Sequence, residues 1–185
     1  MKKQRKRIYT ALLCTCFLFS TASVPVSAAE TEQGEMITLS NRSGEAEVSM
    51  KDALTSALGD STKDTVKLTA DIIIDTTLTV NRAVTLDLNG FVLRMTKEGS
   101  VIKVESSGNL TLTDSNTAAE HKFMPGTNGL WVLNEASGTE IVTGGVITGG
   151  TGHPFQLYST VNCGGGVYIA PGGQLTMTGG NIIGC

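Results

Sequence analysis

Paired carboxylates are the first residues of this 185-residue chain whose types and spacing could do chemistry. Asp71 and Asp75 lie four positions apart in the stretch DIIID, and in a strand that spacing returns both side chains to one face. The two carboxylates would then stand about 13 Å apart, because each strand residue rises about 3.3 Å. Glycosidic-bond hydrolysis needs a closer carboxylate pair, so this spacing does not predict a glycosidase.

Two further aspartates, Asp87 and Asp114, stand beside turn-like stretches rich in Asn, Gly and Ser. An aspartate at such a corner either takes part in chemistry or accepts hydrogen bonds from the backbone N–H groups of the turn. The second interpretation is favoured, since this is the ordinary role of Asp in turns and no Lys or Arg stands convincingly beside either residue. The sequence therefore predicts no catalytic residue in this segment.

Histidines and aromatic residues are the candidates for a binding surface. Two segments rich in loop-forming residues, Thr117–Gly129 and Thr151–Asn162, hold both histidines, and loops on a rigid scaffold often carry binding residues. Their rings would either frame a sugar or partner site or pack the loops onto the scaffold. Trp131 and Tyr168 stand at similar places before Gly-Gly turns and leave the same two alternatives open. The candidate ligand-binding residues are His121, Phe123, Trp131, His153, Phe155, Tyr158 and Tyr168.

The cysteines leave two alternatives open as well. Cys163 and Cys185 are 22 positions apart, roughly one coil of the fold predicted below, so they would form either a disulfide between adjacent coils or two buried thiols. No Cys-x-x-Cys or His-x-x-x-His spacing predicts a zinc site. We expect no metal and no cofactor.

The N-terminal residues predict export. A basic MKKQRKR, an apolar IYTALLCTCFLFSTASV and small residues up to Ala28 and Ala29 are typical of a secretory signal peptide over residues 1–29. The apolar run is short for a membrane span, so we expect contact with the membrane only through this signal. Cleavage would leave 9 basic and 17 acidic residues, a net charge of −8, which excludes nucleic acid as a partner.

Residues 30–47 are polar, acidic and aperiodic, and they predict a flexible linker. The stretch that follows predicts a short helix over residues 49–58, with Ser49 as its N-cap and Asp52 completing a capping box. One face of this helix would be apolar and must pack against another element. The residues of that face are Ala53, Leu54, Ala57 and Leu58.

After residue 59 the hydrophobic period changes to two, and short runs of Val, Ile, Leu and Thr are separated by Asn-Gly, Ser-Gly and Gly-Gly turns. Residues 101–116 align without a gap on residues 166–181, which places Val104 with Ile169 and Leu110 with Leu175. This pattern predicts an all-β fold over residues 48–185, a parallel β-helix whose strands pair with those of the next coil. The helix would cap the open sheet edge at the N-terminal end.

Three stretches, VTLDLNGFVL, GNLTLTDS and GGGVYIAPGGQLTMTGGNI, resemble exported right-handed parallel β-helix repeat proteins of bacteria, in the pectin-lyase-like superfamily. The resemblance covers residues 48–185 and implies a large, adhesin-like protein that is secreted or held at the cell surface. Enzymes of that superfamily act on acidic polysaccharides and would call for clustered aspartates with calcium, or for a Gly-His-Gly. The chain has Gly152-His153-Pro154 instead, which breaks the second pattern.

The closing stretch is a complete repeat without a capping strand, so we expect further coils beyond Cys185 or self-association at an open edge. The predicted function is non-catalytic binding, by an exported protein, of carbohydrate or of a host or neighbouring cell surface. One alternative is the N-terminal part of a polysaccharide lyase or hydrolase whose catalytic coils follow. Another is a structural stalk.

Overall fold

The computed structural model describes residues 45–127, 130–155 and 158–185, all within one compact unit, Gln33–Cys185. Side chains are described throughout these ranges except at residues 45–49 and 154–161. The signal peptide expected over residues 1–29 lies outside the described residues, as does the linker up to residue 44. No helix in the described part of the chain is long and apolar enough to cross a membrane.

The single helix in these ranges, α1 (Glu45–Gly59), begins four residues earlier than the sequence predicted. Ser49 therefore lies inside the helix instead of capping it, and the last three residues of the expected linker are helical. Glu45, Ala46 and Glu47 explain the extension, because Ala and Glu favour helix and negative charge is favourable at a helix N-terminus. The apolar face is largely as predicted, with Leu54 and Leu58 completely buried.

Helix α1 packs against the first strand of each of three parallel sheets, β1 (Thr65–Lys67), β2 (Ile72–Ile74) and β3 (Leu78–Val80). Its C-terminal carbonyls are held by a side chain from outside the helix. The Arg82 guanidinium donates to the carbonyls of Ala57 and Leu58 at 3.1 and 2.8 Å. These hydrogen bonds satisfy carbonyl groups that a helix end leaves without an internal partner.

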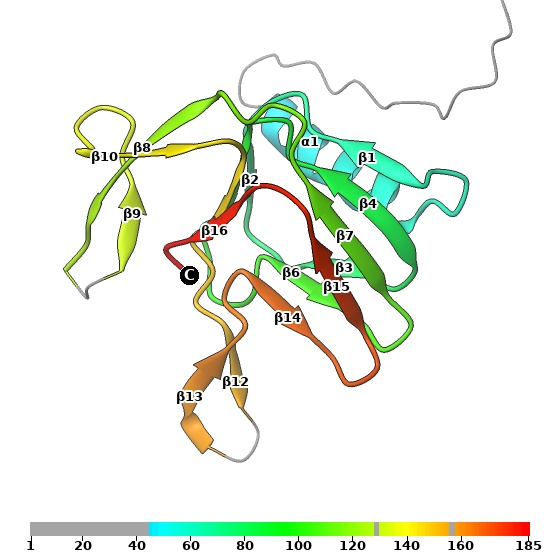
Figure 1. The fold of residues 1–185 in the computed structure, drawn as a ribbon. Coiled ribbons are helices and arrows are strands. Elements are labelled where there is room, and N and C mark those ends of the chain that lie inside the picture. The colour runs from blue at the N-terminus through cyan, green and yellow to red at the C-terminus, as the bar shows by residue number, and fades with distance from the viewer. Residues whose placement is uncertain (1–44, 128–129, 156–157) are drawn as a thin grey trace, which may run out of the picture. The chain divides into compact units, whose positions relative to one another are not determined.

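The remaining parallel strands extend these three sheets (Figure 1). The first sheet adds β4 (Ala83–Asp87), β7 (Asn109–Thr113) and β15 (Gln174–Met177) in that order. The second adds β5 (Val92–Met95), β11 (Val146–Thr148) and β16 (Asn181–Ile183), and the third adds β6 (Ile102–Val104) and β14 (Val167–Ile169). Along the chain, successive parallel strands enter the first, second and third sheet in turn.

The strand register confirms the alignment made from the sequence. Val104 lies opposite Ile169, and Leu110 lies opposite Leu175, in parallel pairs. The Gly-Gly pairs at residues 144–145 and 179–180 likewise precede the paired strands β11 and β16. The fold is therefore mostly β with one short helix, and its main sheets are parallel, as the sequence predicted.

The core is a set of aliphatic rows that run across the paired strands. In the second sheet, for example, Ile72, Leu93 and Ile147 occupy one row and are at most 1 % exposed. Side chains of all three sheets and of α1 meet in this one core. Aromatic residues contribute little to it, which agrees with an aromatic content of only 5 %.

Asp114 ties together strand connections that are far apart in sequence. Its carboxylate accepts the backbone N–H of Gly90 and the backbone N–H of Gly145, each at 2.7 Å, and only 8 % of the residue is exposed. Asp87 similarly accepts the backbone N–H groups of Asn89 and Ser115. The interpretation of these aspartates as corner residues that accept backbone hydrogen bonds is thus confirmed.

Two insertions interrupt the parallel strands, and each contains β-structure in a segment where the sequence predicted a loop, namely residues 117–129 and 151–162. Between β7 and β11 lies an antiparallel sheet of β8 (Glu120–Pro125), β9 (Trp131–Leu133) and β10 (Glu140–Thr143), with β8 in the middle. Between β11 and β14 lies a hairpin of β12 (His153–Phe155) and β13 (Tyr158–Cys163). In Figure 1 both stand beside the parallel sheets. Trp131 and Tyr168 are therefore not equivalent, since only Tyr168 belongs to a parallel sheet.

The three-stranded insertion covers part of the second sheet with a small core of its own. Phe123 of β8 packs with Val92 and Val146, whose side chains leave the sheet on the face opposite the main core. Leu133 and Val142 complete the contact from β9 and β10. The second sheet is consequently packed on both faces at this point.

Removing the Asp114 carboxylate should destabilise the fold. In Asp114→Ala the N–H groups of Gly90 and Gly145 lose their acceptor in a buried place, and we expect the free energy of unfolding to fall by about 3 kcal/mol. Asp60→Ala is the matched control, because Asp60 accepts hydrogen bonds from Thr62 in an exposed turn where water can replace it. Urea denaturation of both variants makes the measurement, and equal losses would contradict this account.

Truncating Phe123 should loosen the insertion. Phe123 is 1 % exposed, and Phe123→Ala leaves a cavity over Val92 and Val146 that costs about 3–5 kcal/mol. The neighbouring Met124 is 37 % exposed on the same strand, so Met124→Ala should cost far less. Amide hydrogen exchange in β8–β10 distinguishes the two, and similar protection in both variants would show that this packing does not hold the insertion.

Candidate functional site

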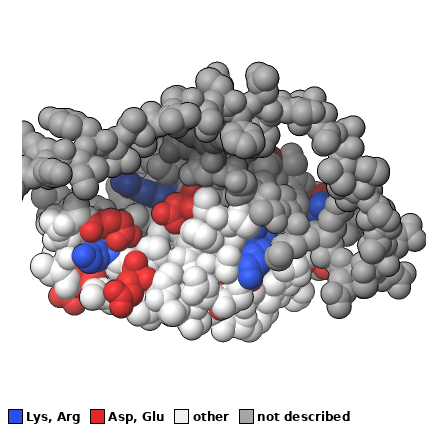
Figure 2. Space-filling view, turned by 90° about the horizontal axis from the view of Figure 1, so that it is seen from above, with Lys and Arg blue, Asp and Glu red and all other residues white. Residues whose placement is uncertain are grey.

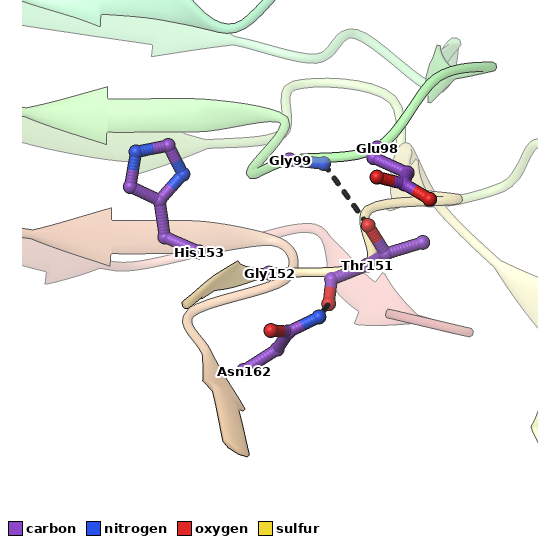
Figure 3. Close-up of a pocket in the computed structure, with 6 residues that line it drawn as sticks. All are labelled: Glu98, Gly99, Thr151, Gly152, His153 and Asn162. Carbon is purple, nitrogen blue, oxygen red and sulfur yellow. Dashed lines mark hydrogen bonds between the residues drawn. The ribbon is translucent and has the colours of Figure 1, made fainter. Parts of the chain in front are cut away.

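A pocket of about 330 Å³ lies where the β12–β13 hairpin leaves the parallel sheets. Figure 3 shows Glu98 and Gly99 on one segment facing Thr151, Gly152 and Asn162 on another, with His153 to one side. The first segment connects β5 to β6, and the second leads from β11 into the hairpin and back out of it. Residues more than fifty positions apart thus share one site.

Backbone hydrogen bonds fix the two segments of the pocket together. Gly99 donates its N–H to Thr151 Oγ1 at 3.0 Å, and its carbonyl accepts the N–H groups of Thr151 and Gly152. Asn162 Nδ2 donates to the Thr151 carbonyl at 3.1 Å and so fastens the end of the hairpin to its beginning. The pocket is therefore built from bonded main chain and does not depend on side-chain packing alone.

Gly152 makes the entry into the hairpin sterically feasible. Its φ is +84°, in the left-handed region, and a Cβ at this position would stand 2.8 Å from the Cys163 carbonyl oxygen. A residue with a side chain would strain the backbone and also push the two hairpin strands apart.

The polar groups of the pocket are mainly hydrogen-bond acceptors. Glu98 and Asn162 are exposed, and Asn162 Oδ1 stays available because the amide nitrogen is the atom bound to Thr151. Thr151 Oγ1 accepts from Gly99, which leaves its hydroxyl proton free to donate. Among the described residues that line the pocket, Glu98 is the one with a full charge, and none of them is Lys or Arg.

An aromatic pair adjoins these polar groups. The rings of His153 and Tyr168 have centroids 5.7 Å apart with planes tilted by 38°. Tyr168 projects from β14, where it pairs in register with Lys103 of β6. Lys103 is bound to Glu105 at 2.8 Å, and this hydrogen bond and charge raise the pKa of Lys103, so its cation is already partnered.

Of the residues that the sequence proposed for ligand binding, His153 and Tyr168 pair beside the pocket, and Phe123 and Trp131 line a second groove. Phe123 and His121 are buried, and His121 bridges the Gly90 carbonyl at 2.8 Å and Glu135 Oε1 at 3.0 Å. Both residues pack the insertion onto the sheet, which is the alternative that the sequence left open. The side chains of Phe155 and Tyr158 lie outside the described residues.

Trp131 lies at a different place, in an apolar groove of about 310 Å³ beside β10 and β16. Trp131 is 41 % exposed, and Ile141 on the opposite edge strand, β10, is 57 % exposed. Of the described residues that line this groove, Glu140 alone is of a charged type. The groove offers apolar contact but few groups that would orient a polar ligand.

Sequence reasoning missed Glu98, which lines the pocket from the connection between β5 and β6. The signal was a Lys-Glu-Gly-Ser turn, which by itself indicates only a change of chain direction. Thr151 and Asn162 were recognised only as the ends of the second loop segment. Their hydrogen bond to each other gives those ends their part in the site.

The aspartates that were considered first for chemistry have hydrogen-bond or ion-pair partners within the fold. Asp71 accepts the N–H of Val92 at 2.9 Å, and Asp75 is paired with Lys51. Burial raises the pKa of the Asp87 carboxyl, but hydrogen bonds from Ser115 and Asn89 and the charge of Lys67 outweigh it, so the net pKa lies below its usual value. Among the residues that the structure describes, no three His, Cys, Asp or Glu side chains cluster to hold a metal ion.

Cys163 and Cys185 are both free thiols, which agrees with the predicted alternative of two thiols and not with the disulfide. Cys163 is exposed, which differs from the expected pair of buried thiols. Cys185 is partly buried, and burial raises the pKa of its thiol. The Cys185 thiol is therefore protonated and unreactive at neutral pH.

Surface charge does not gather into a patch of one sign on the face seen in Figure 2, where acidic and basic side chains are intermixed. No family model, curated protein or solved structure matches the chain.

Replacing Gly152 should disturb the pocket specifically. In Gly152→Ala the positive φ and the close Cys163 carbonyl together cost about 1–2 kcal/mol, and the amides of β12 and β13 should exchange faster. Gly59→Ala is the control, because a Cβ there meets nothing within 4 Å and Ala is the better helix former. Hydrogen exchange of the hairpin that is unchanged in Gly152→Ala would refute this role.

Proposed function

We propose that residues 48–185 form a right-handed parallel β-helix that displays a carbohydrate-binding site. The strand order supports this fold, because successive strands enter three parallel sheets in turn and each strand pairs with its counterpart one circuit away. Right-handed crossovers are the strong preference for parallel strands in one sheet. The helix α1, against the first strand of each sheet, is well placed to cap the N-terminal end.

The same proposal includes export. The signal-like residues 1–29 and the acidic composition of the remainder are its support, together with the resemblance of the repeats to exported adhesin-like proteins. An exported protein of this kind meets the glycans of a host or of neighbouring cells. Carbohydrate is therefore the ligand class in reach of the site.

The observation that carries the binding proposal is the pairing of His153 and Tyr168 beside a polar pocket. Sugar rings present apolar C–H faces that pack on aromatic rings, while their hydroxyl groups need hydrogen-bond acceptors and donors at fixed positions. The pocket offers Glu98 and Asn162 as acceptors and Thr151 as a donor. Its volume of about 330 Å³ lies at the lower end of the range for small-molecule sites.

We infer binding without turnover. Asp71, Asp87 and Asp114, which were weighed as candidates for chemistry, accept backbone hydrogen bonds and shape the fold. The described lining of the pocket includes one carboxylate, Glu98, whereas glycoside hydrolysis ordinarily uses two. The proposed mechanism is recognition by a preformed surface.

Glycan binding by the purified chain tests this function. A panel of immobilised oligosaccharides should include ligands that bind the chain, and His153→Ala or Tyr168→Ala should weaken that binding roughly tenfold through loss of the aromatic contact. Trp131→Ala, in the other groove, should bind as the unaltered chain does. Absence of binding across the panel, or equal binding by all variants, would reject the site. Release of new reducing ends from a bound glycan would reject binding without turnover.

A further inference from the structure

We propose that the pocket selects uncharged sugars over sugar acids, and that Glu98 is the residue that sets this selectivity. This inference rests on the carbohydrate-binding function proposed above and names the ligand class of the same site. The observation that carries it is different. It is the charge of Glu98 in the pocket, together with the position of Lys97 and Lys103 outside the pocket lining.

A uronate carboxylate or a sulfate is normally held by Arg or Lys, and neither is among the described residues that line this pocket. A bound sugar acid would therefore lie beside the carboxylate of Glu98 with no lysine or arginine of that lining to balance the two negative charges. Like charges placed together in this way oppose binding and reject the wrong ligand.

Two lysines, one beside Tyr168 in the sheet and one beside Glu98 in the sequence, act on other carboxylates. Lys103, opposite Tyr168 in the sheet, is bound to Glu105. Lys97 precedes Glu98 in sequence but does not line the pocket, and its charge acts on Asp75, whose pKa is lowered first by Lys51 and more weakly by Lys97. Neither lysine compensates the carboxylate of Glu98 inside the pocket.

The available groups match a neutral polyol. Glu98 and Asn162 Oδ1 accept from hydroxyl groups, and Thr151 can donate to a ring or hydroxyl oxygen. A charge-assisted hydrogen bond from a sugar hydroxyl to Glu98 is stronger than one between neutral groups. The same carboxylate thus favours the neutral sugar and disfavours the acid.

Ligand pairs that differ only in charge make the test. Binding of the full chain is measured by calorimetry with oligosaccharides of galactose and of galacturonic acid, and with the corresponding pair of glucose and glucuronic acid. We expect the neutral member of a pair to bind at least about tenfold more tightly, and this preference to shrink at high salt because the repulsion is screened.

Three variants assign the preference to a residue. Glu98→Gln keeps the shape but removes the charge, and it should reduce the preference at least about fivefold with little change in folding, since Glu98 is exposed. Glu98→Lys should reverse the preference toward the sugar acid. Glu140→Gln, in the Trp131 groove, is the matched control and should leave the preference unchanged.

The outcomes separate this inference from the function beneath it. If neither member of either pair binds and the broader glycan panel also fails, the binding function itself is overturned. If the sugar acid binds as well as the neutral sugar, or if Glu98→Gln leaves the preference intact, the binding function stands and the selectivity is wrong. A preference that moves with Glu98 and not with Glu140 supports it.

Discussion

Stacking of aliphatic side chains across parallel strands is the interaction on which the rest of the structure depends. Each of the described parallel strands has only three to five residues and cannot bury its own apolar face. Rows such as Ile72, Leu93 and Ile147 achieve burial only because consecutive strands of one sheet are held in register. Every other feature, from the helix to the pocket, takes its position from these rows.

Hydrogen bonds between side chains and the backbone fix the connections that the short strands do not hold by themselves. The carboxylate of Asp114 reaches connections that precede β5 and β11, and the guanidinium of Arg82 closes the end of α1. Both residues are of charged types, and in this fold both hold backbone groups in place through hydrogen bonds. Polar residues in this chain are therefore poor indicators of chemistry unless their backbone partners are known.

The parallel pairing could be predicted because the repeat recurs in the sequence, and the aspartate corners because they depend on local turn residues. Strand β8 of the first insertion could not, since most residues of EHKFMP have low strand propensity, and its alternation of buried and exposed positions arises from contact with Val92 and Val146. The site was predictable only in part. His153 and Tyr168 were identified as residue types, but the place of Glu98 follows from the hydrogen bond of the next residue, Gly99, to Thr151 52 positions away, which no local pattern encodes.

Both insertions lie in connections that lead from one parallel sheet to the next, so neither changes the register of the parallel strands around it. The length and content of these connections are thus free to vary while the aliphatic rows stay constant. A scaffold of this kind separates the residues under selection for folding from those under selection for recognition. New surfaces can then be acquired by changing connections one at a time, with little cost to the frame that carries them.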